Sequence, residues 1–351
     1  LLRGLCISMA FVLTLMLVNS ASRVVLFLQA LVLSGLFQAT YGSCMVLSGL
    51  ELGFFVEKYA SLGVATGTFV NRNHLAGYLV MCLAAGIGLL IVQLKPERSG
   101  SWRPRLQEFL ALMLSPTMRL RVYLAVMVIA LVLTRSRMGN IAFFLSLALA
   151  GLVLIASSKR VSLKLVSLFV SLLVVDVLIL SRWFGLNKLL ERFESVDVGT
   201  LESQGRYWLD YYSWNYFQDF RWVGSGGGSF YGVFPNYQGQ QLQGYFEHVH
   251  NDYLELLLEL GPVALALLAI FLGSSLVTAI RLQLVRRSRV ARAVGFTVAM
   301  AIFWALIHSL ADFNLQVLAN AYTLVALCAL AFSVNGLRHG QKQDRRDGLD
   351  L

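Results

Sequence analysis

Histidine, arginine and carboxylate side chains are concentrated in a few short segments of this chain. Residues 247–252, Glu-His-Val-His-Asn-Asp, precede a long apolar run and hold two of the five histidines. A histidine can accept a proton near neutral pH, so His250 is a candidate general base. Asn251 or Asp252 would cap the helix that follows, and the free backbone amides of that helix would favour an anion. This segment is therefore the first candidate site.

Two other functions are open for the same segment. His248 and His250 are two positions apart with acidic neighbours, so they could hold a metal, although no third ligand has helical spacing. They could equally be hydrogen-bonding residues at a membrane interface. Asp252, Glu255 and Glu259 would form one acidic stripe on a helix. Because an unpaired carboxylate at membrane depth is costly, we expect an arginine to pair with this stripe.

Further polar residues lie at the ends of apolar runs. Arginines that share one cavity favour a multivalent oxyanion such as pyrophosphate, because the guanidinium fork matches phosphate geometry. His308 and Asp312 are four residues apart, so they could hydrogen-bond as a structural or a catalytic pair. The candidates outside 247–252 are Arg72, Asn73, His74, Arg135, Arg137, Arg206, Arg221, His308 and Asp312.

Two stretches before this segment have unusual compositions. Residues 205–217 are dense in aromatic side chains, which stack on sugar rings or anchor helices at a membrane interface. Residues 222–230, Trp-Val-Gly-Ser-Gly-Gly-Gly-Ser-Phe, lack the Gly-Lys-Ser/Thr and helix of a nucleotide P-loop. A plain turn and an anion-binding nest of backbone amides are both open for the second stretch.

The composition indicates the elements that must position these residues. Of 351 residues, 57% are hydrophobic and 14% charged, whereas soluble domains have about 45–50% apolar and about 25% charged residues. The chain is therefore neither an ordinary soluble enzyme nor disordered. We predict an all-α polytopic membrane protein. Nine apolar runs approach the length that crosses a bilayer: 3–20, 24–48, 74–94, 120–134, 139–157, 163–181, 253–273, 293–310 and 317–336.

The distribution of positive charge predicts the orientation of these spans. The net charge is +10, which we assign to basic loops at a membrane rather than to nucleic-acid binding. About two thirds of the lysines and arginines fall in five connections on one side, which the positive-inside rule makes cytoplasmic. All candidate site residues then lie on the periplasmic side. The first residue is periplasmic too, so we expect an odd number of upstream spans to be missing.

The chain is thereby divided into four parts. We predict an N-terminal bundle of six spans at 1–181 and a large periplasmic loop with interfacial helices at 182–252. Three C-terminal spans follow at 253–336, and a basic cytoplasmic tail occupies 337–351. The four cysteines are far apart in apolar runs, so we expect neither a disulfide framework nor a zinc site.

Several motifs together resemble the O-antigen ligase and Wzy polymerase superfamily of bacterial membrane glycosyltransferases. The most specific is His250-Asn251 followed, after nine residues, by Gly261. The chain departs from the family pattern at Met138 and Ala264. The motifs occur in the expected order and are GTFVNRNHLAGYL (67–79), TRSRMGN (134–140), GRYWLDYY (205–212), GSGGGSF (224–230), HVHNDYLELLLELG (248–261) and HSLADFNLQVLANA (308–321).

The resemblance implies a GT-C-like fold of about twelve spans, of which this chain would hold about nine. It implies an inverting, metal-independent transfer, without a cofactor, of a glycan from undecaprenyl pyrophosphate to an acceptor hydroxyl at the periplasmic face of the inner membrane. His250 would be the base or orient the acceptor, and Arg137 and Arg206 would hold the pyrophosphate. The remaining candidates would line the same cavity.

Three acceptors are compatible with the resemblance: lipid A-core for a ligase, another lipid-linked repeat for a polymerase, or a protein hydroxyl for an oligosaccharyltransferase. We favour the ligase on the pattern at His250 and Gly261. A transporter of polyprenyl-linked sugars should have polar residues on both sides and two similar halves, and neither is evident. A non-catalytic scaffold would make the polar residues dispensable.

Overall fold

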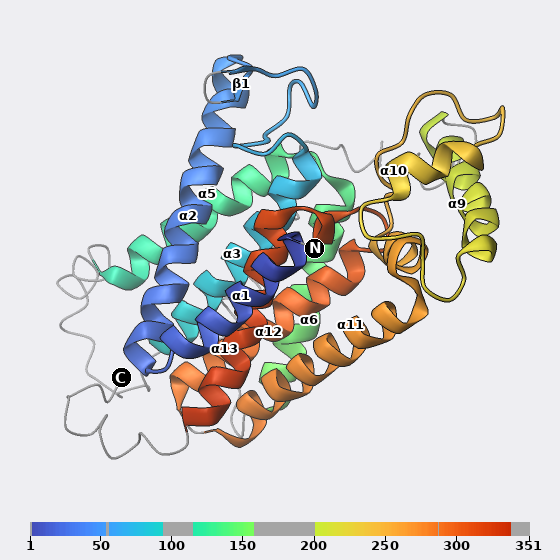
Figure 1. Cartoon of the computed structure of the whole chain (residues 1–351). Coiled ribbons are helices and arrows are strands. Elements are labelled where there is room, and N and C mark those ends of the chain that lie inside the picture. The colour runs from blue at the N-terminus through green and yellow to red at the C-terminus, as the bar shows by residue number, and fades with distance from the viewer. Residues whose placement is uncertain (1, 54–55, 94–114, 158–200, 287, 338–351) are drawn as a thin grey trace, which may run out of the picture.

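The computed structural model describes residues 2–53, 56–93, 115–157, 201–286 and 288–337, with the backbone alone at 201–206. These residues are mostly helical (Figure 1). In chain order the elements are α1 (Leu2–Leu17), α2 (Ala21–Ser48), β1 (Leu52–Gly53), β2 (Val56–Glu57), α3 (Arg72–Gln93), α5 (Pro116–Leu133), α6 (Arg137–Ala156), α9 (Leu201–Asp219), α10 (Phe230–Val233), η1 (Phe234–Asn236), α11 (Asp252–Val285), α12 (Arg289–His308), η2 (Asn314–Gln316) and α13 (Leu318–Gly336).

Among the described residues, seven helices are long and apolar enough to cross a membrane, namely α2, α3, α5, α6, α11, α12 and α13. The shorter apolar helix α1 precedes them. These helices cover every predicted span except 163–181, which lies outside the described residues. The chain is therefore a mostly helical, multi-pass membrane protein, as its composition predicts. The number of spans in the whole chain stays a prediction.

Apolar side chains also cover the outside of the bundle. Large hydrophobic residues on α2, α6 and α11 are at least two-fifths exposed, including Leu26, Leu33, Leu149, Val263 and Ile270. Contiguous apolar surface of this kind is rare on soluble proteins. It is the surface that lipid chains would solvate.

Helix α3 is the centre of the bundle. Every residue from His74 to Val92 is buried, and α2, α5, α6, α12 and α13 pack around it. Small residues permit this close packing. A Cβ atom added at Gly88 would lie 2.2 Å from the Thr297 hydroxyl oxygen, and this hydroxyl donates to the Ala84 carbonyl at 3.0 Å. The α3–α12 contact therefore requires glycine at position 88.

Serine residues determine where several helices begin. Helices α2, α5, α6 and α12 each follow a serine whose hydroxyl accepts a hydrogen bond from the amide three residues later. This N-cap satisfies an amide that would otherwise lack an intrahelical partner. Ser136 caps α6 in this way, so that Arg137 is the first residue of this helix.

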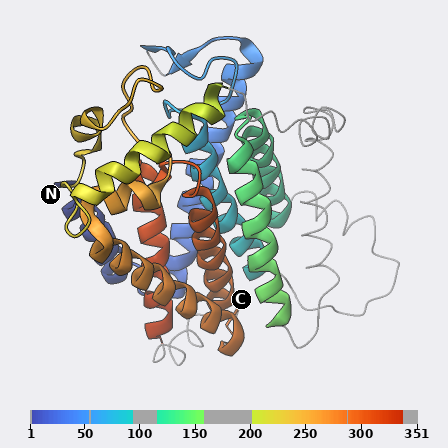
Figure 2. The ribbon, with the colours of Figure 1, turned by 90° about the vertical axis from the view of Figure 1, so that its right-hand side faces the viewer.

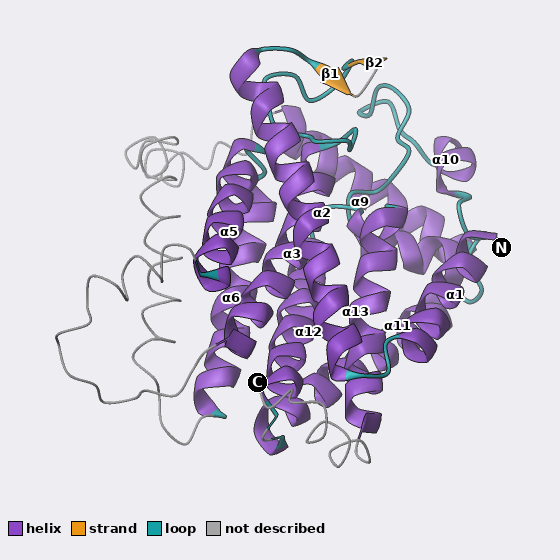
Figure 3. Ribbon diagram, turned by 90° about the vertical axis from the view of Figure 1, so that its left-hand side faces the viewer, coloured by secondary structure: helices purple, strands orange, loops and turns teal. Residues whose placement is uncertain are grey.

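The two ends of the bundle differ in chemistry. At one end the Ala65 amide donates to the Leu133 carbonyl at 3.0 Å, and the Asn320 amide group donates to the His74 carbonyl at 3.1 Å. We call this the polar end, because the starts of α3, α6, α11 and α13 meet there. The β1–β2 hairpin, which the sequence does not predict, lies beyond α2 at this end (Figure 3). At the opposite end Arg286 donates to the Asn335 carbonyl at 2.7 Å.

Residues 201–251 lie against the start of α11. Figures 1 and 2 show α9 and α10 beside the first turns of this helix. The segment has a small aromatic core of its own, formed with α11 by Leu209, Tyr216, Phe230, Phe234, Leu242, Val249 and Leu258. This core fixes the 247–251 stretch at the polar end.

Helix α11 is kinked at Gly261, where φ is 76° and ψ is 176°. Pro262 has no amide hydrogen, so the Leu258 carbonyl loses its helical partner. The Ser225 amide donates to this carbonyl at 3.0 Å, and the Gly226 amide donates to the Glu259 carbonyl at 2.8 Å. The glycine-rich turn therefore repairs the hydrogen bonding that the kink disrupts.

We expect Gly88→Val to destabilise the bundle, because the branched side chain would separate α3 from α12 and disrupt the Thr297 hydrogen bond. Overpacking of this kind costs about 1–3 kcal/mol. Thermal unfolding of the detergent-solubilised protein measures the effect. Gly273→Val on α11 is the matched control, since a Cβ atom there has no neighbour within 4 Å. Equal melting temperatures for the two variants would contradict the proposed packing.

Candidate active site at the polar end

A histidine–carboxylate pair lies at the start of α11. His250 Nδ1 lies 3.3 Å from Asp312 Oδ1, and because an ionised carboxylate can only accept, Nδ1–H donates. The His250 side chain is 35% exposed, whereas that of Asp312 is 1% exposed. The free Nε2 is thereby the nitrogen that can exchange a proton with a bound molecule. Both residues are candidate site residues from the sequence, but the sequence does not predict that they pair with each other.

The environment of Asp312 keeps this carboxyl group ionised. Burial alone would raise its pKa, but the hydrogen bond from His250 and the nearby charge of His308 lower the pKa below its ordinary value. A lowered pKa means that the carboxylate persists throughout the neutral range. It is protonated only when the pH falls through that lowered pKa.

The backbone also holds His250 in a specific position. Its φ is +61°, a left-handed conformation that non-glycine residues adopt where their surroundings enforce it. Asn251 follows as the N-cap of α11, and its side-chain oxygen accepts from the Tyr253 and Leu254 amides at 3.1 and 3.2 Å. The Asp252 amide donates to the Ser309 carbonyl at 3.0 Å. The expected anion site at this helix start is therefore wrong, because these amides already have partners.

Asp252 joins α11 to the loop that carries Asp312. Its Oδ2 accepts from the Ser309 hydroxyl at 2.8 Å and from the Leu315 amide at 3.1 Å. The residue is 3% exposed. The structure thus shows Asp252 as a buried residue that bonds to the protein, although the sequence suggests that it binds substrate.

Three of the histidine rings contact one aromatic side chain, that of Phe313. The His248 ring stacks on it with centroids 4.1 Å apart and planes 20° apart. His74 and His250 approach the same ring nearly at right angles, with centroid distances of 4.7 and 5.0 Å. Because His248 covers one face of Phe313, the other two rings lie at its opposite face or its edges. The sequence gives no signal for this role, since the side chain of Phe313 is apolar and carries no group that could do acid–base chemistry.

The acidic stripe on α11 is real, but its partners differ from those expected. Glu255 Oε1 lies 2.6 Å from His248 Nδ1, and Oε2 accepts from the Val249 amide at 3.1 Å. Among the described contacts, histidine and backbone amides rather than an arginine pair with the stripe. Burial lowers the pKa of His248, but the hydrogen bond and charge of Glu255 outweigh it and raise this pKa. The His248 cation therefore persists to a higher pH than that of a free histidine.

The glycine-rich turn is a backbone nest, and an internal carboxylate fills it. Glu259 Oε2 accepts from the Gly228 amide at 2.8 Å, and Oε1 accepts from the Phe230 amide at 3.0 Å. These are the amides that a bound anion would use. The turn therefore positions the 201–251 segment on α11 and is not open to an external phosphate.

His308 and Asp312 do not pair. Helix α12 ends at His308, so the helical spacing between the two residues is lost. The Asn314 side-chain amide instead donates to His308 Nδ1 at 2.8 Å, while the Asn320 amide donates to Asn314 Oδ1 at 2.7 Å. His308 and Asn320 are 0% exposed. This chain of hydrogen bonds lies behind Asp312 and links α12, η2 and α13.

The arginine candidates differ in how far they are buried. Arg72 and Asn73 are half-buried at the start of α3, and His74 is buried. Arg135 and Arg137 are exposed where α6 begins, and Arg135 has a left-handed φ of +51°. Arg221 is exposed and donates to the Gln218 carbonyl at 3.1 Å. Arg206 lies in α9, but its side chain lies outside the described part of the structure.

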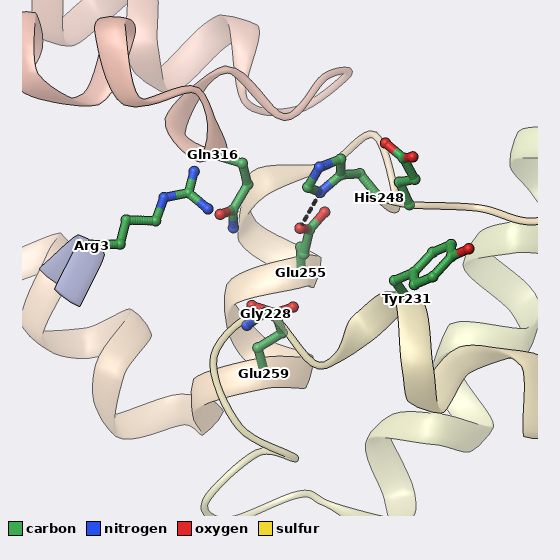
Figure 4. A pocket seen from close by; sticks show the side chains of 8 residues that line it. Arg3, Gly228, Tyr231, His248, Glu255, Glu259 and Gln316 are labelled. Carbon is green, nitrogen blue, oxygen red and sulfur yellow. Dashed lines mark hydrogen bonds and ion pairs between the residues drawn. The ribbon is translucent and has the colours of Figure 1, made fainter. Parts of the chain in front are cut away.

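A cavity of about 270 Å³ opens beside His248 (Figure 4). Its walls include Arg3, Tyr231, Glu247, His248, Glu255 and Gln316, which come from α1, α10, the 247–251 stretch, α11 and η2. The sequence does not predict Arg3, Tyr231 or Gln316 as site residues. They become neighbours only because α1, α10 and η2 meet at the polar end.

The sequence leaves a metal site open as a function of His248 and His250. Within the described residues, no group of three or more histidine, cysteine, aspartate or glutamate side chains could hold a metal ion. His248 and His250 instead pair separately with Glu255 and Asp312.

Comparison with known proteins identifies one family. Residues 122–269 match the family model described as O-antigen ligase. The match extends from within α5 to the middle of α11, so it includes Arg137, Arg206 and His250. No curated protein matches the chain. The match confirms the resemblance to the O-antigen ligase and Wzy polymerase superfamily that the motifs indicate, over the matched residues.

Proposed function

We propose that the protein is a glycosyltransferase that moves a glycan from undecaprenyl pyrophosphate to an acceptor hydroxyl. The match of residues 122–269 to the O-antigen ligase family supports a ligase-like or polymerase-type function. The observation that carries the finer proposal is the His250–Asp312 pair, in which a partly exposed imidazole is oriented by a buried carboxylate. This is the arrangement that a general base requires.

In the proposed reaction, the acceptor hydroxyl attacks the anomeric carbon of the donor sugar. The bond between that carbon and the pyrophosphate oxygen breaks, and the configuration inverts. His250 Nε2 orients the hydroxyl and takes its proton, while Asp312 stabilises the imidazolium that forms. The undecaprenyl pyrophosphate leaves as an anion and needs no proton.

The basic residues at the starts of α3, α6 and α9 are the proposed site for that anion. Arg137 and Arg206 would hold the pyrophosphate, with Arg72 and Arg135 adding positive charge. Guanidinium groups bind phosphate oxygens in a bidentate manner and so stabilise charge that develops on the leaving group. The acidic stripe of α11 is unsuited to this task, because carboxylates repel phosphate.

We propose a ligase, with lipid A-core as the acceptor, on the pattern of His250-Asn251 and Gly261. The site would face the periplasm from the inner membrane. A deletion strain separates this proposal from its alternatives. Rough core with normal polymer would support a ligase, and accumulation of single repeat units would instead indicate a polymerase. Loss of glycan from proteins would indicate an oligosaccharyltransferase.

We expect His250→Ala to lower kcat for glycan transfer by about 10²- to 10⁴-fold, the usual contribution of a general base. Asp312→Asn should lower kcat as well and leave KM for the donor nearly unchanged, because Asp312 positions His250 and does not contact the donor. The assay is transfer from undecaprenyl-pyrophosphate glycan to lipid A-core in detergent with EDTA present.

Asp219→Asn is the matched control for the aspartate variant. Asp219 is an exposed carboxylate that accepts from the Tyr237 hydroxyl at 2.6 Å, away from His250. It should retain the wild-type kcat. Full activity in both His250→Ala and Arg206→Ala would refute the roles assigned to these residues, and no transfer by the wild-type protein would leave a scaffold. Complete loss of wild-type activity in EDTA would refute metal-independent transfer.

The proposed orientation predicts which residues an impermeant reagent reaches in intact spheroplasts. In a variant whose four cysteines are replaced by alanine, Gln243→Cys at the polar end should react with a membrane-impermeant maleimide. Ser288→Cys between α11 and α12 should react only after the membrane is permeabilised. Both positions are exposed in the structure. The opposite labelling pattern would place the site in the cytoplasm.

A further inference from the structure

The cavity beside His248 differs in charge from the basic region at α3 and α6. Glu247, Glu255 and Glu259 contribute carboxylates to its walls, whereas Arg3 and His248 contribute positive charge (Figure 4). A pyrophosphate carries several negative charges and would be repelled by three carboxylates. The cavity therefore fits a part of a substrate other than the leaving group.

The carboxylates are held in place and still have capacity to accept hydrogen bonds. Each oxygen of Glu255 and Glu259 accepts one hydrogen bond from the protein. A carboxylate has about four acceptor positions, so about two are left on each side chain. Hydroxyl groups of a sugar are donors that suit these positions. Gln316 and Arg3 on the opposite wall can donate to ring or hydroxyl oxygens.

Tyr231 adds an apolar surface to this polar lining. Its side chain is 53% exposed, and Figure 4 shows it at the rim of the cavity, across from Gln316. Aromatic rings stack on the C–H faces of sugar rings. The volume of about 270 Å³ lies just below the usual range for small-molecule pockets, about 300–1,000 Å³. It therefore suits a single sugar ring better than an oligosaccharide.

The position of the cavity relative to Phe313 indicates which sugar it binds. His248 forms part of the cavity wall and stacks on Phe313, and His250 approaches the same ring with centroids 5.0 Å apart. The wall of the cavity and His250 are thus in contact with one shared side chain. In the proposed reaction the acceptor is the substrate whose hydroxyl must reach His250, so the acceptor is the substrate that a cavity this close to His250 would hold.

We propose that this cavity is the acceptor subsite, and that it binds one uncharged or amino-bearing sugar ring and disfavours a phosphorylated or uronic one. The inference rests on the proposed function, because it assumes that His250 takes a proton from the acceptor. It adds the location of the acceptor and the charge that the acceptor ring must have. Glu247 is the residue that discriminates by charge, since it is exposed at the rim.

The first experiment compares kinetic constants for Tyr231→Ala in full-length protein. Transfer is measured to lipid A-core whose core phosphates have been removed. KM for this acceptor should rise about 3- to 10-fold, as expected for the loss of one stacking contact, while KM for the donor stays the same. Tyr59→Ala is the matched control, because Tyr59 is an exposed tyrosine that does not line the cavity.

The second experiment tests charge selection with Glu247→Gln. The wild-type protein should use the dephosphorylated acceptor at least 10-fold better, in kcat/KM, than the same acceptor with its phosphates. Glu247→Gln should reduce this preference several-fold, and Glu247→Lys should reduce it further. A preference that is the same in all three proteins would overturn the assigned selectivity.

The two proposals fail in distinguishable ways. If the wild-type protein transfers no glycan to any acceptor, the proposed function fails. If transfer proceeds and Tyr231→Ala raises KM for the donor in place of the acceptor, the cavity holds the donor sugar and the acceptor assignment is wrong. If Tyr231→Ala changes neither KM, the cavity binds no substrate ring.

Discussion

The geometry of the site depends on one buried carboxylate, that of Asp252. It accepts hydrogen bonds from the Ser309 hydroxyl and the Leu315 amide. Ser309 comes before Asp312 in the chain and Leu315 comes after it. The start of α11 and the loop between α12 and α13 are thereby held together. His250, two positions before Asp252, can contact Asp312 only while this junction is intact. Asp252 thus determines the position of His250, the proposed base.

Two sets of charged residues are important for the proposed function. The arginines lie where α3, α6 and α9 begin, and the carboxylates lie along the first turns of α11. Phe313 contacts both His248, which pairs with Glu255, and His74, two residues after Arg72. Among the described residues, the acidic stripe forms its ion pair with His248 and not with these arginines. In the proposed function the arginines are therefore able to bind phosphate, and the carboxylates are able to bind hydroxyl groups.

The sequence predicts the parts of this site better than their contacts. Long apolar runs are enough to predict the helices, and the Asn251 cap follows from its position before such a run. The partner of Asp312 is a tertiary property, because His250 lies 62 residues earlier and no local rule joins them. The expected His308–Asp312 pair fails because α12 ends at His308. Phe313 and Tyr231 resemble ordinary core or interface aromatics, so only the fold reveals their surroundings.

The kink of α11 has a consequence for the order of biosynthesis. Until the 222–226 turn docks, the Leu258 and Glu259 carbonyls would enter the bilayer without partners, which is costly in hydrocarbon. The turn precedes α11 in the chain, so it has already left the ribosome when the helix is made. The amides that complete α11 are thus present before they are needed. In a circularly permuted chain that begins at α11, this helix would have to insert with its hydrogen bonds incomplete.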